Sequence, residues 1–363
     1  MAAVSDHDDP LLQPLRLGDI ECANRVVMAP MTRSRADADD RPTALHVEYY
    51  AQRASAGLIV TEGVQPSIHG KGYPRTPGLH ETAQVEAWRA VTTAVHARGG
   101  RIVAQLMHVG RIAHHLNKRT GARTVAPSAV RANVSLYTDT AGMQTCDAPE
   151  PLSIADIAGV IEEFATAARL ARAAGFDGVE LHCTSGYLPM QFLASNTNLR
   201  SDGYGGDAAR RARFVVETLE GLVGAIGAGR VGFRICPGNP FNDVFDPDPI
   251  DTTRTLLEAV RSLRCAYLHV IGAPDRTLDA FALARRHHDT ALIINDGFEP
   301  ATAREAIVAA RGDAVSFGRH YVSNPDLVER IAGGHPLAAF DRRTLYTPGA
   351  KGYTDYPKWQ VTT

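Results

Sequence analysis

Short apolar runs recur along the chain, and each ends in polar, glycine or proline residues before a longer amphipathic segment begins. There are eight such runs, and apolar residues at helical spacing fill the intervals between them. This alternation predicts a (β/α)₈ barrel, in which each parallel strand is followed by a helix. The predicted strands are Arg25–Pro30, Leu58–Gly63, Arg101–His108, Gly178–Cys183, Val231–Pro237, Cys265–Gly272, Ala291–Gly297 and Ala314–Arg319.

The intervening segments predict the helices, and three further stretches fall outside the repeat. Residues 111–151 are too long for a simple connection and carry short alternating pieces, so we expect a hairpin lid after the third strand. Residues 334–363 carry Tyr346, Tyr353, Tyr356 and Trp359 and are expected to fold back over the barrel mouth, whereas residues 1–15 are expected to be flexible. The predicted helices are Ala44–Ala56, Glu81–Arg98, Ser153–Ala174, Asp207–Ile226, Ile250–Leu263, Arg276–His287, Pro300–Ala309 and Pro325–Ala332.

Composition narrows the class of protein. A barrel of this kind with insertions accounts for all 363 residues as one domain, 1–363. The net charge is −2 and no block of Lys or Arg stands out, which argues against nucleic acid or a membrane surface as a partner. The acidic first ten residues lack the pattern of a signal peptide, so we expect a cytoplasmic protein, as a monomer or homodimer. Five scattered cysteines predict free, mostly buried thiols.

Barrels place their chemistry where strands end, so these positions supply the candidate residues. The last two predicted strands end in Asn295-Asp-Gly297 and Ser316-Phe-Gly318-Arg319. Phosphate frequently binds at this place in barrels, and the guanidinium fork of Arg319 suits a phosphate monoester. A surface salt bridge of Arg319 is the alternative.

The fourth strand ends in a second group of candidates. His182, Ser185 and Tyr187 combine a proton carrier with two hydroxyl donors within a few residues. A lone histidine is more often structural, but this combination at a strand end favours a catalytic role. Gln105 and Arg234 end the third and fifth strands, where a polar ligand would be needed to satisfy them.

A set of spaced motifs carries a resemblance to a known family. In chain order the motifs span Met28–Arg33 (MAPMTR), Glu48–Tyr50, Gln52–Gly57, Lys71–Tyr73, Gln105–Arg111, Phe317–Arg319 and Gly352–Pro357. Together they resemble the old yellow enzyme family of FMN-dependent ene-reductases over nearly the whole chain. The resemblance implies FMN as cofactor and NADPH or NADH as hydride donor. By this resemblance, a threonine at position 32 marks the classical branch of the family. The other large branch carries Cys at this position.

The resemblance also implies how the flavin is held. Thr32 would lie near the flavin C4 carbonyl, Gln105 would hold the pyrimidine edge, and Arg234 would favour negative charge at the N1–C2=O end. Arg319 would bind the phosphate. The residues implied in flavin binding are Ala29, Pro30, Met31, Thr32, Gly63, Gln105, His182, Arg234, Gly297, Gly318 and Arg319.

In the family's reaction, a nicotinamide reduces FMN and leaves, and an electron-poor alkene such as an α,β-unsaturated carbonyl then takes its place. By resemblance, His182 with a second donor would polarise the substrate carbonyl, and Tyr187 would protonate Cα. Tyr73 and Tyr353 would form walls of the substrate site.

Two positions depart from the family pattern. Ser185 stands where His or Asn is usual, three residues after the histidine, and Met107 stands where several relatives carry Trp. Serine is a shorter donor and both changes alter the pocket, so we expect a larger, specialised substrate.

Other functions remain open from the sequence. A Schiff-base aldolase needs a lysine at a strand end, and Lys71, Lys118, Lys351 and Lys358 are all elsewhere. A flavin-binding protein without turnover has no need of a proton donor such as Tyr187, whereas a specialist isomerase or desaturase would use the same flavin site. A metal-dependent hydrolase is favoured weakly, because Glu180 and His182 share a strand face, although no metal is predicted. Its ligands would come from His108, His114, His115, His182 and His269.

Overall fold

The computed structural model describes residues 9–274 and 277–360. Within these ranges eight parallel strands close into a barrel, in the order in which they occur along the chain. The predicted barrel is confirmed, and each strand starts inside its predicted run. The barrel strands are β3 (Val26–Met28), β4 (Leu58–Val64), β5 (Ile102–Leu106), β10 (Gly178–Cys183), β11 (Val231–Ile235), β12 (Tyr267–Ile271), β13 (Ala291–Asn295) and β14 (Ala314–Phe317).

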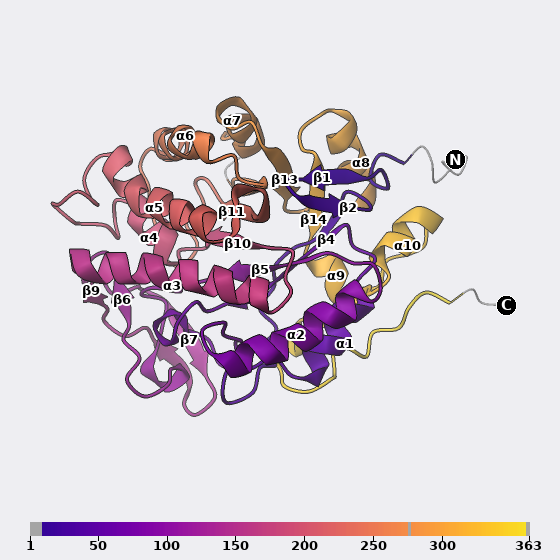
Figure 1. Ribbon diagram of the computed structural model, residues 1–363, viewed down its shortest axis with the longest axis horizontal. Coiled ribbons are helices and arrows are strands. Elements are labelled where there is room, and N and C mark those ends of the chain that lie inside the picture. Colours follow the sequence, from indigo (N-terminus) through magenta and orange to yellow (C-terminus); the bar gives the residue numbers. More distant parts are fainter. Residues whose placement is uncertain (1–8, 275–276, 361–363) are drawn as a thin grey trace.

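Helices surround the barrel, and α2, α3 and α5 run side by side along one flank (Figure 1). The longer helices occupy the predicted intervals, although α7 begins only at Ala280 and the predicted start at Arg276 lies outside the described residues. Two short helices, α4 and α9, follow strand ends directly. The helices are α1 (Ala44–Gln52), α2 (Thr82–His96), α3 (Ile154–Ala173), α4 (Leu188–Leu193), α5 (Ala208–Ile226), α6 (Pro249–Val260), α7 (Ala280–His287), α8 (Pro300–Val308), α9 (Arg319–Ser323) and α10 (Leu327–Gly333). Single 3₁₀ turns are η1 (Ile68–Gly70), η2 (His115–Asn117), η3 (Ala228–Arg230), η4 (Arg261–Leu263) and η5 (Arg342–Thr344).

Local sequence accounts for these elements. The barrel strands are rich in Val, Ile and Leu and are buried on both faces, as expected for parallel strands covered by helices. The Ser153 side chain accepts the Asp156 amide and begins α3, and Asp207 does the same for Arg210 at α5. Gly175 follows α3 with φ +89°, a conformation that only glycine adopts without strain. Helices α3 and α5 therefore begin, and α3 ends, where the sequence provides a cap.

A hairpin of β1 (Leu15–Leu17) and β2 (Ile20–Cys22) covers the amino-terminal end of the barrel. Its apolar side chains pack with residues that start the barrel strands. The prediction of a flexible segment over residues 1–15 is therefore wrong for residues 9–15. Leu11 is fully buried, and Asp9 forms an ion pair with Arg304. The remainder, residues 1–8, lies outside the described residues.

The segment after β5 contains the expected hairpin, formed by β7 (Ser135–Thr138) and β8 (Gly142–Thr145). A second pair, β6 (Val125–Ala126) and β9 (Glu150–Pro151), closes its base. Leu136 from the hairpin packs in one apolar cluster with Met107 and Tyr187. This excursion therefore builds a wall beside the carboxyl ends of the barrel strands.

Two buried arginines hold the carboxyl-terminal tail over the mouth of the barrel. Arg33 donates to the carbonyl oxygens of Leu345 at 3.3 Å and Gly352 at 2.6 Å. Arg35 donates to those of Thr344 at 2.8 Å and Leu345 at 2.6 Å. Because both arginines lie in the segment that follows β3, the tail is fixed next to the strand ends.

All five cysteines are buried and free of disulfides, which confirms the expectation from their spacing. None of the helices in the described ranges combines the length and apolar character that crossing a membrane requires.

Candidate active site

Three cavities adjoin one another at the carboxyl ends of the barrel strands. The central cavity, of about 310 Å³, shares Arg234 and Arg319 with a neighbour of about 620 Å³, which we name the arginine cavity. On its other side it shares Tyr187 and Tyr346 with an outer cavity of about 830 Å³. The central cavity is lined by Pro30, Met31, Thr32, Arg33, Gly63, Gln105, Met107, His182, Ser185, Tyr187, Arg234, Phe241, Arg319, Val322, Phe340, Leu345 and Tyr346.

The arginine cavity gathers the ends of β3, β13 and β14, including Ala29, Gly297 and Gly318. Arg319 reaches it from the start of α9, and among the described residues no ion pair or hydrogen bond of its side chain is found. The alternative of a surface salt bridge is therefore not what the structure shows. Asp296 and Glu299 also line this cavity. Arg319 is thus a cation available to an anionic ligand.

Gln105 and Arg234 form polar parts of the central cavity. Gln105 donates its Nε2 to Glu180 at 2.8 Å, and Arg234 donates one terminal nitrogen to Asn295 at 2.7 Å. The Nε of Arg234 is buried and has no hydrogen-bond partner within the described part of the chain. A buried, unpartnered guanidinium nitrogen is costly, so a ligand with an acceptor is needed here.

His182 is neutral and presents a hydrogen-bond donor. Burial, with a smaller effect from the Arg234 charge, lowers its pKa to about 3. The backbone amide of Thr184 donates to His182 Nδ1 at 3.2 Å, so the single ring proton sits on Nε2. His182 lies opposite Arg234 in the register of β10 and β11, and both line the central cavity.

Tyr187 precedes α4 and is 8% exposed. Its phenol donates to the phenol of Tyr73 at 3.1 Å, and its ring meets that of His182 edge-on, with centroids 4.9 Å apart. Burial, reinforced by Tyr73, raises the pKa of Tyr187 well above its usual value. The phenol therefore keeps its proton at neutral pH, in contact with both the central and the outer cavity.

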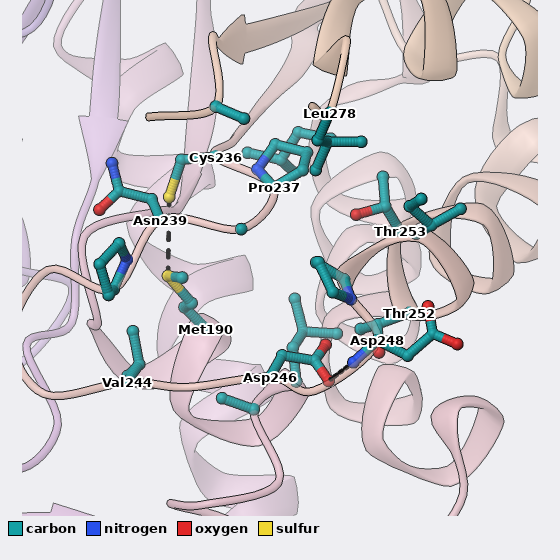
Figure 2. A pocket seen from close by; sticks show the side chains of 18 of the residues that line it. Met190, Cys236, Pro237, Asn239, Val244, Asp246, Asp248, Thr252, Thr253 and Leu278 are labelled. Atoms are coloured by element: carbon teal, nitrogen blue, oxygen red, sulfur yellow. Dashed lines mark hydrogen bonds between the residues drawn. The ribbon is translucent and has the colours of Figure 1, made fainter. Parts of the chain in front are cut away.

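Ser185 lies between these two residues in a left-handed conformation, with φ +58°. Sulfur atoms support its backbone, since the amide of Ser185 donates to Cys236 Sγ at 3.4 Å and that of Gly186 donates to Met190 Sδ at 3.2 Å. Cys236 also donates to Met190 across 3.6 Å. Figure 2 shows this contact on one side of a fourth cavity, of about 330 Å³, behind the segment.

Gly63, Met107 and Thr32 shape the other wall of the central cavity. A Cβ on Gly63 would lie 2.5 Å from the thioether of Met107, so a larger residue at position 63 would force the Met107 side chain to move. Thr32 borders the central and outer cavities. All three positions come from the ends of strands or the segments just after them.

The outer cavity contains Tyr73 and Thr32 as well as three aromatic residues that sequence reasoning missed, Tyr137, Phe241 and Tyr346. Tyr137 lies on β7, and the other two lie on irregular segments, after β11 and in the tail, where no strand end or motif marks them. Tyr353 corrects the prediction of a substrate wall. It is fully buried and stacks on Tyr49 with centroids 4.0 Å apart, outside the lining of the three cavities.

The features expected of the rival enzymes are not assembled. Lys118 donates to the carbonyl oxygens of His69 and Arg123, away from the strand ends. His114 and His115 approach Asp147, but His114 Nδ1 accepts the Leu116 amide, which places the ring proton on Nε2. That nitrogen then has no lone pair for a metal.

Glu180 and His269, two further residues considered for a metal-dependent hydrolase, bind each other within the barrel. Glu180, which shares a strand face with His182, binds Gln105 and the ring of His269, at 2.8 and 2.9 Å. Its carboxylate is therefore occupied by side chains of the protein rather than directed at a ligand site.

Comparison with known proteins places this geometry in a family. Residues 10–338 match the model of the NADH:flavin oxidoreductase / NADH oxidase family. A probable flavin mononucleotide-dependent alkene reductase from Leishmania infantum is 40% identical, covering 98% of this chain and all of the relative. 12-Oxophytodienoate reductase 7 from Oryza sativa subsp. japonica is 36% identical, covering 96% of this chain and 94% of the relative.

Solved structures agree with these relatives. The old yellow enzyme homologue from Zymomonas mobilis superimposes with a TM-score of 0.93 at 38% identity, covering 96% of this chain and 99% of that chain. Morphinone reductase gives a TM-score of 0.92 at 39% identity, covering 96% of each chain. With the barrel and its strand-end site, these matches establish that the chain belongs to the NADH:flavin oxidoreductase / NADH oxidase family, which includes the old yellow enzymes.

Proposed function

We propose that this protein is an FMN-dependent ene-reductase that takes hydride from NAD(P)H and reduces the C=C bond of an α,β-unsaturated carbonyl compound. One observation carries the proposal. A neutral His182 with its proton on Nε2 and a protonated Tyr187 lie side by side in one cavity, next to the unpartnered Nε of Arg234. A carbonyl-polarising donor and a proton donor are the two groups that this reaction asks of the protein.

The residues present fit FMN. The unpartnered Nε of Arg234 and the free Oε1 of Gln105 offer a donor and an acceptor to a pyrimidine edge. Arg319, which lines both the central cavity and the adjoining arginine cavity, suits the phosphate. When bound, FMN carries hydride from the nicotinamide to the alkene.

The side chains then divide the work on the substrate. His182 donates its Nε2–H to the carbonyl oxygen and so stabilises the negative charge that develops there. Tyr187 gives its phenolic proton to Cα, on the side of the outer cavity. Tyr73, which accepts the hydrogen bond of Tyr187, holds the phenol in place between transfers.

The pocket favours a substrate larger than a simple cyclic enone. Ser185 provides a short hydroxyl where a longer second donor would reach the carbonyl, and Met107 is narrower than an aromatic side chain. The outer cavity of about 830 Å³ continues directly from Tyr187 and provides room for such a substrate.

The test begins with the colour of the purified protein. We expect yellow holoenzyme that NADPH or NADH bleaches without oxygen, and a panel of enones that restores the colour. Product analysis with and without nicotinamide then separates a net reductase from an isomerase or desaturase. Folded protein that is colourless and takes up no added FMN would disprove the proposal.

A further inference from the structure

A fully buried carboxylate, that of Glu180, lies within the barrel, and among the described residues Gln105 is the one lining residue of the central cavity that hydrogen-bonds to it. Glu180 projects from β10, and its Oε1 accepts the Nε2 of Gln105 at 2.8 Å. Its Oε2 is 2.9 Å from Nδ1 of His269 on β12. The proposed function leaves Glu180 without contact to the substrate. A buried carboxylate is expensive to keep, so its place here requires a reason.

The hydrogen bonds fix the charge of this group. His269 Nε2 is 2.8 Å from Ser316 Oγ, so the ring is held between Glu180 and Ser316. Burial, helped by the Arg234 charge, lowers the pKa of His269, which keeps the ring neutral with its proton on Nδ1. Burial alone would raise the pKa of Glu180, but His269, Arg234 and Gln105 hold it below its usual value. Glu180 is therefore a buried negative charge.

Glu180 also determines which atoms Gln105 presents to the cavity. An ionised carboxylate only accepts hydrogen bonds, so it must face the amide nitrogen of Gln105 and not its oxygen. The oxygen Oε1 is thereby left for a ligand, and among the described residues it accepts no hydrogen bond. Without the carboxylate, the amide of Gln105 would be free to turn over.

The same charge acts on Arg234. In the register of β10 and β11, Glu180 lies opposite Gly232, two residues before Arg234, so both side chains point into the barrel. Among the described residues no hydrogen bond joins the two side chains. Both are buried, however, and the charge of Arg234 helps to lower the pKa of Glu180. Burial lowers the pKa of Arg234, and the charge of Glu180 opposes this effect. The negative charge therefore offsets part of the positive field that Arg234 applies to a ligand.

We infer that Glu180 is a positioning residue for the flavin, which fixes the acceptor face of Gln105 and lowers the reduction potential of bound FMN by offsetting Arg234. The inference rests on the proposed function. A flavin that has gained electrons is stabilised by Arg234, so a nearby negative charge makes the reduced state less favourable. The low potential in turn makes hydride transfer to the alkene more favourable.

The variant Glu180→Gln removes the charge at nearly constant volume. At a fixed ratio of reduced to oxidised reference dye, we expect the ratio of reduced to oxidised FMN to rise at least tenfold over wild type. For this two-electron couple, a tenfold rise corresponds to an increase of about 30 mV in the reduction potential. FMN affinity should fall as well, because a glutamine no longer fixes the amide of Gln105. As control, Glu217→Gln removes a surface charge paired with Arg213 and should leave both quantities unchanged.

Glu180→Asp keeps the negative charge but moves the carboxylate away from Gln105, because the side chain is one methylene shorter. If Glu180→Gln does not fold, this variant tests the inference instead. We expect weaker FMN binding with the ratio of reduced to oxidised FMN within threefold of wild type. Unchanged affinity and an unchanged ratio in Glu180→Gln, or a tenfold change of the ratio in Glu180→Asp, would overturn the inference. A wild-type protein that binds no FMN would instead disprove the proposed function itself.

Discussion

The phenol of Tyr187 donates a hydrogen bond to the phenol of Tyr73 across 3.1 Å, at the boundary of the central and outer cavities. Burial raises the pKa of both groups, so each keeps its proton at neutral pH. The pair joins the end of β10 to the segment after η1. The site therefore contains the phenolic proton of Tyr187 and, beside it, the phenol of Tyr73, which can accept or relay that proton.

Replacing Tyr187 by phenylalanine should separate the two halves of the reaction. Reduction of FMN by NADPH needs no proton donor at this position and should stay within about twofold of wild type. Reduction of an enone should fall about 10² to 10⁴-fold, because general-acid catalysis of this size is lost. Stopped-flow absorbance of each half-reaction measures both. Tyr73→Phe, which keeps Tyr187, should lose far less; equal losses in both variants would argue against Tyr187 as the donor.

Stability should depend on pH through His182. Its pKa is about 3 in the folded protein, against 6.5 as its ordinary value. As the pH falls below that value, the unfolded chain takes up a proton that the folded protein refuses, so the free energy of unfolding decreases. Between pH 6.5 and pH 5 this residue should cost about 1.5 kcal/mol. Urea unfolding of wild type and His182→Gln measures it, and parallel pH profiles would show that His182 is not the cause.

Replacing Arg319 by glutamine should weaken the binding of FMN but not that of riboflavin. The guanidinium has no partner among the described residues and would serve the phosphate, which riboflavin lacks. Charge-assisted hydrogen bonds contribute about 1.5 to 3 kcal/mol, so FMN affinity should fall about 10 to 150-fold. Flavin fluorescence titrations provide both constants. If the affinity for riboflavin fell by the same factor, Arg319 would support the fold of the site and would not bind the phosphate.

Installing asparagine at position 185 should convert the protein toward a general enone reductase. Asparagine tolerates the left-handed conformation of Ser185, with φ +58°, so the backbone needs no change. A recovered second donor is worth about 2.7 to 4 kcal/mol in the transition state, and we expect kcat/KM for simple cyclic enones to rise at least about tenfold. Ser185→Ala serves as control. If wild type is already as fast as Ser185→Asn, the specialised pocket is wrong.

Replacing Arg35 by methionine should release the tail. The guanidinium donates to the carbonyl oxygens of Thr344, Leu345 and Lys351, among others, and is 4% exposed. Losing these bonds should destabilise the protein by about 2 to 4 kcal/mol and expose the tail to protease. The control is Arg343→Met, because that side chain is 88% exposed. Equal protease sensitivity of the two variants would contradict the role of Arg35.

The sequence predicts the part of the site that strands bring together. Gln105, His182 and Arg234 each end a barrel strand, and closure of the barrel places them in one cavity whatever the loops do. Arg319 follows from the same rule. Local capping can also be predicted from the sequence, since the Ser153 side chain and Asp156 form the expected start of α3.

The sequence does not predict what irregular segments contribute. Tyr346 enters the cavities because Arg35 binds the tail 310 residues later in the chain, a contact that no local pattern encodes. Tyr353 belongs to the same tail but stacks in the core on Tyr49, so aromatic composition alone does not distinguish the two. The amino-terminal hairpin was missed for a related reason, since its strands of three residues are too short to show an alternation.

The tail also determines when the site can exist during synthesis. Arg33 binds carbonyl oxygens 312 and 319 positions further along, so these partners are synthesised after all eight barrel strands. The barrel can form earlier, but the wall that carries Tyr346 cannot. A nascent chain that has not yet reached these residues therefore holds an open cavity that lacks this wall.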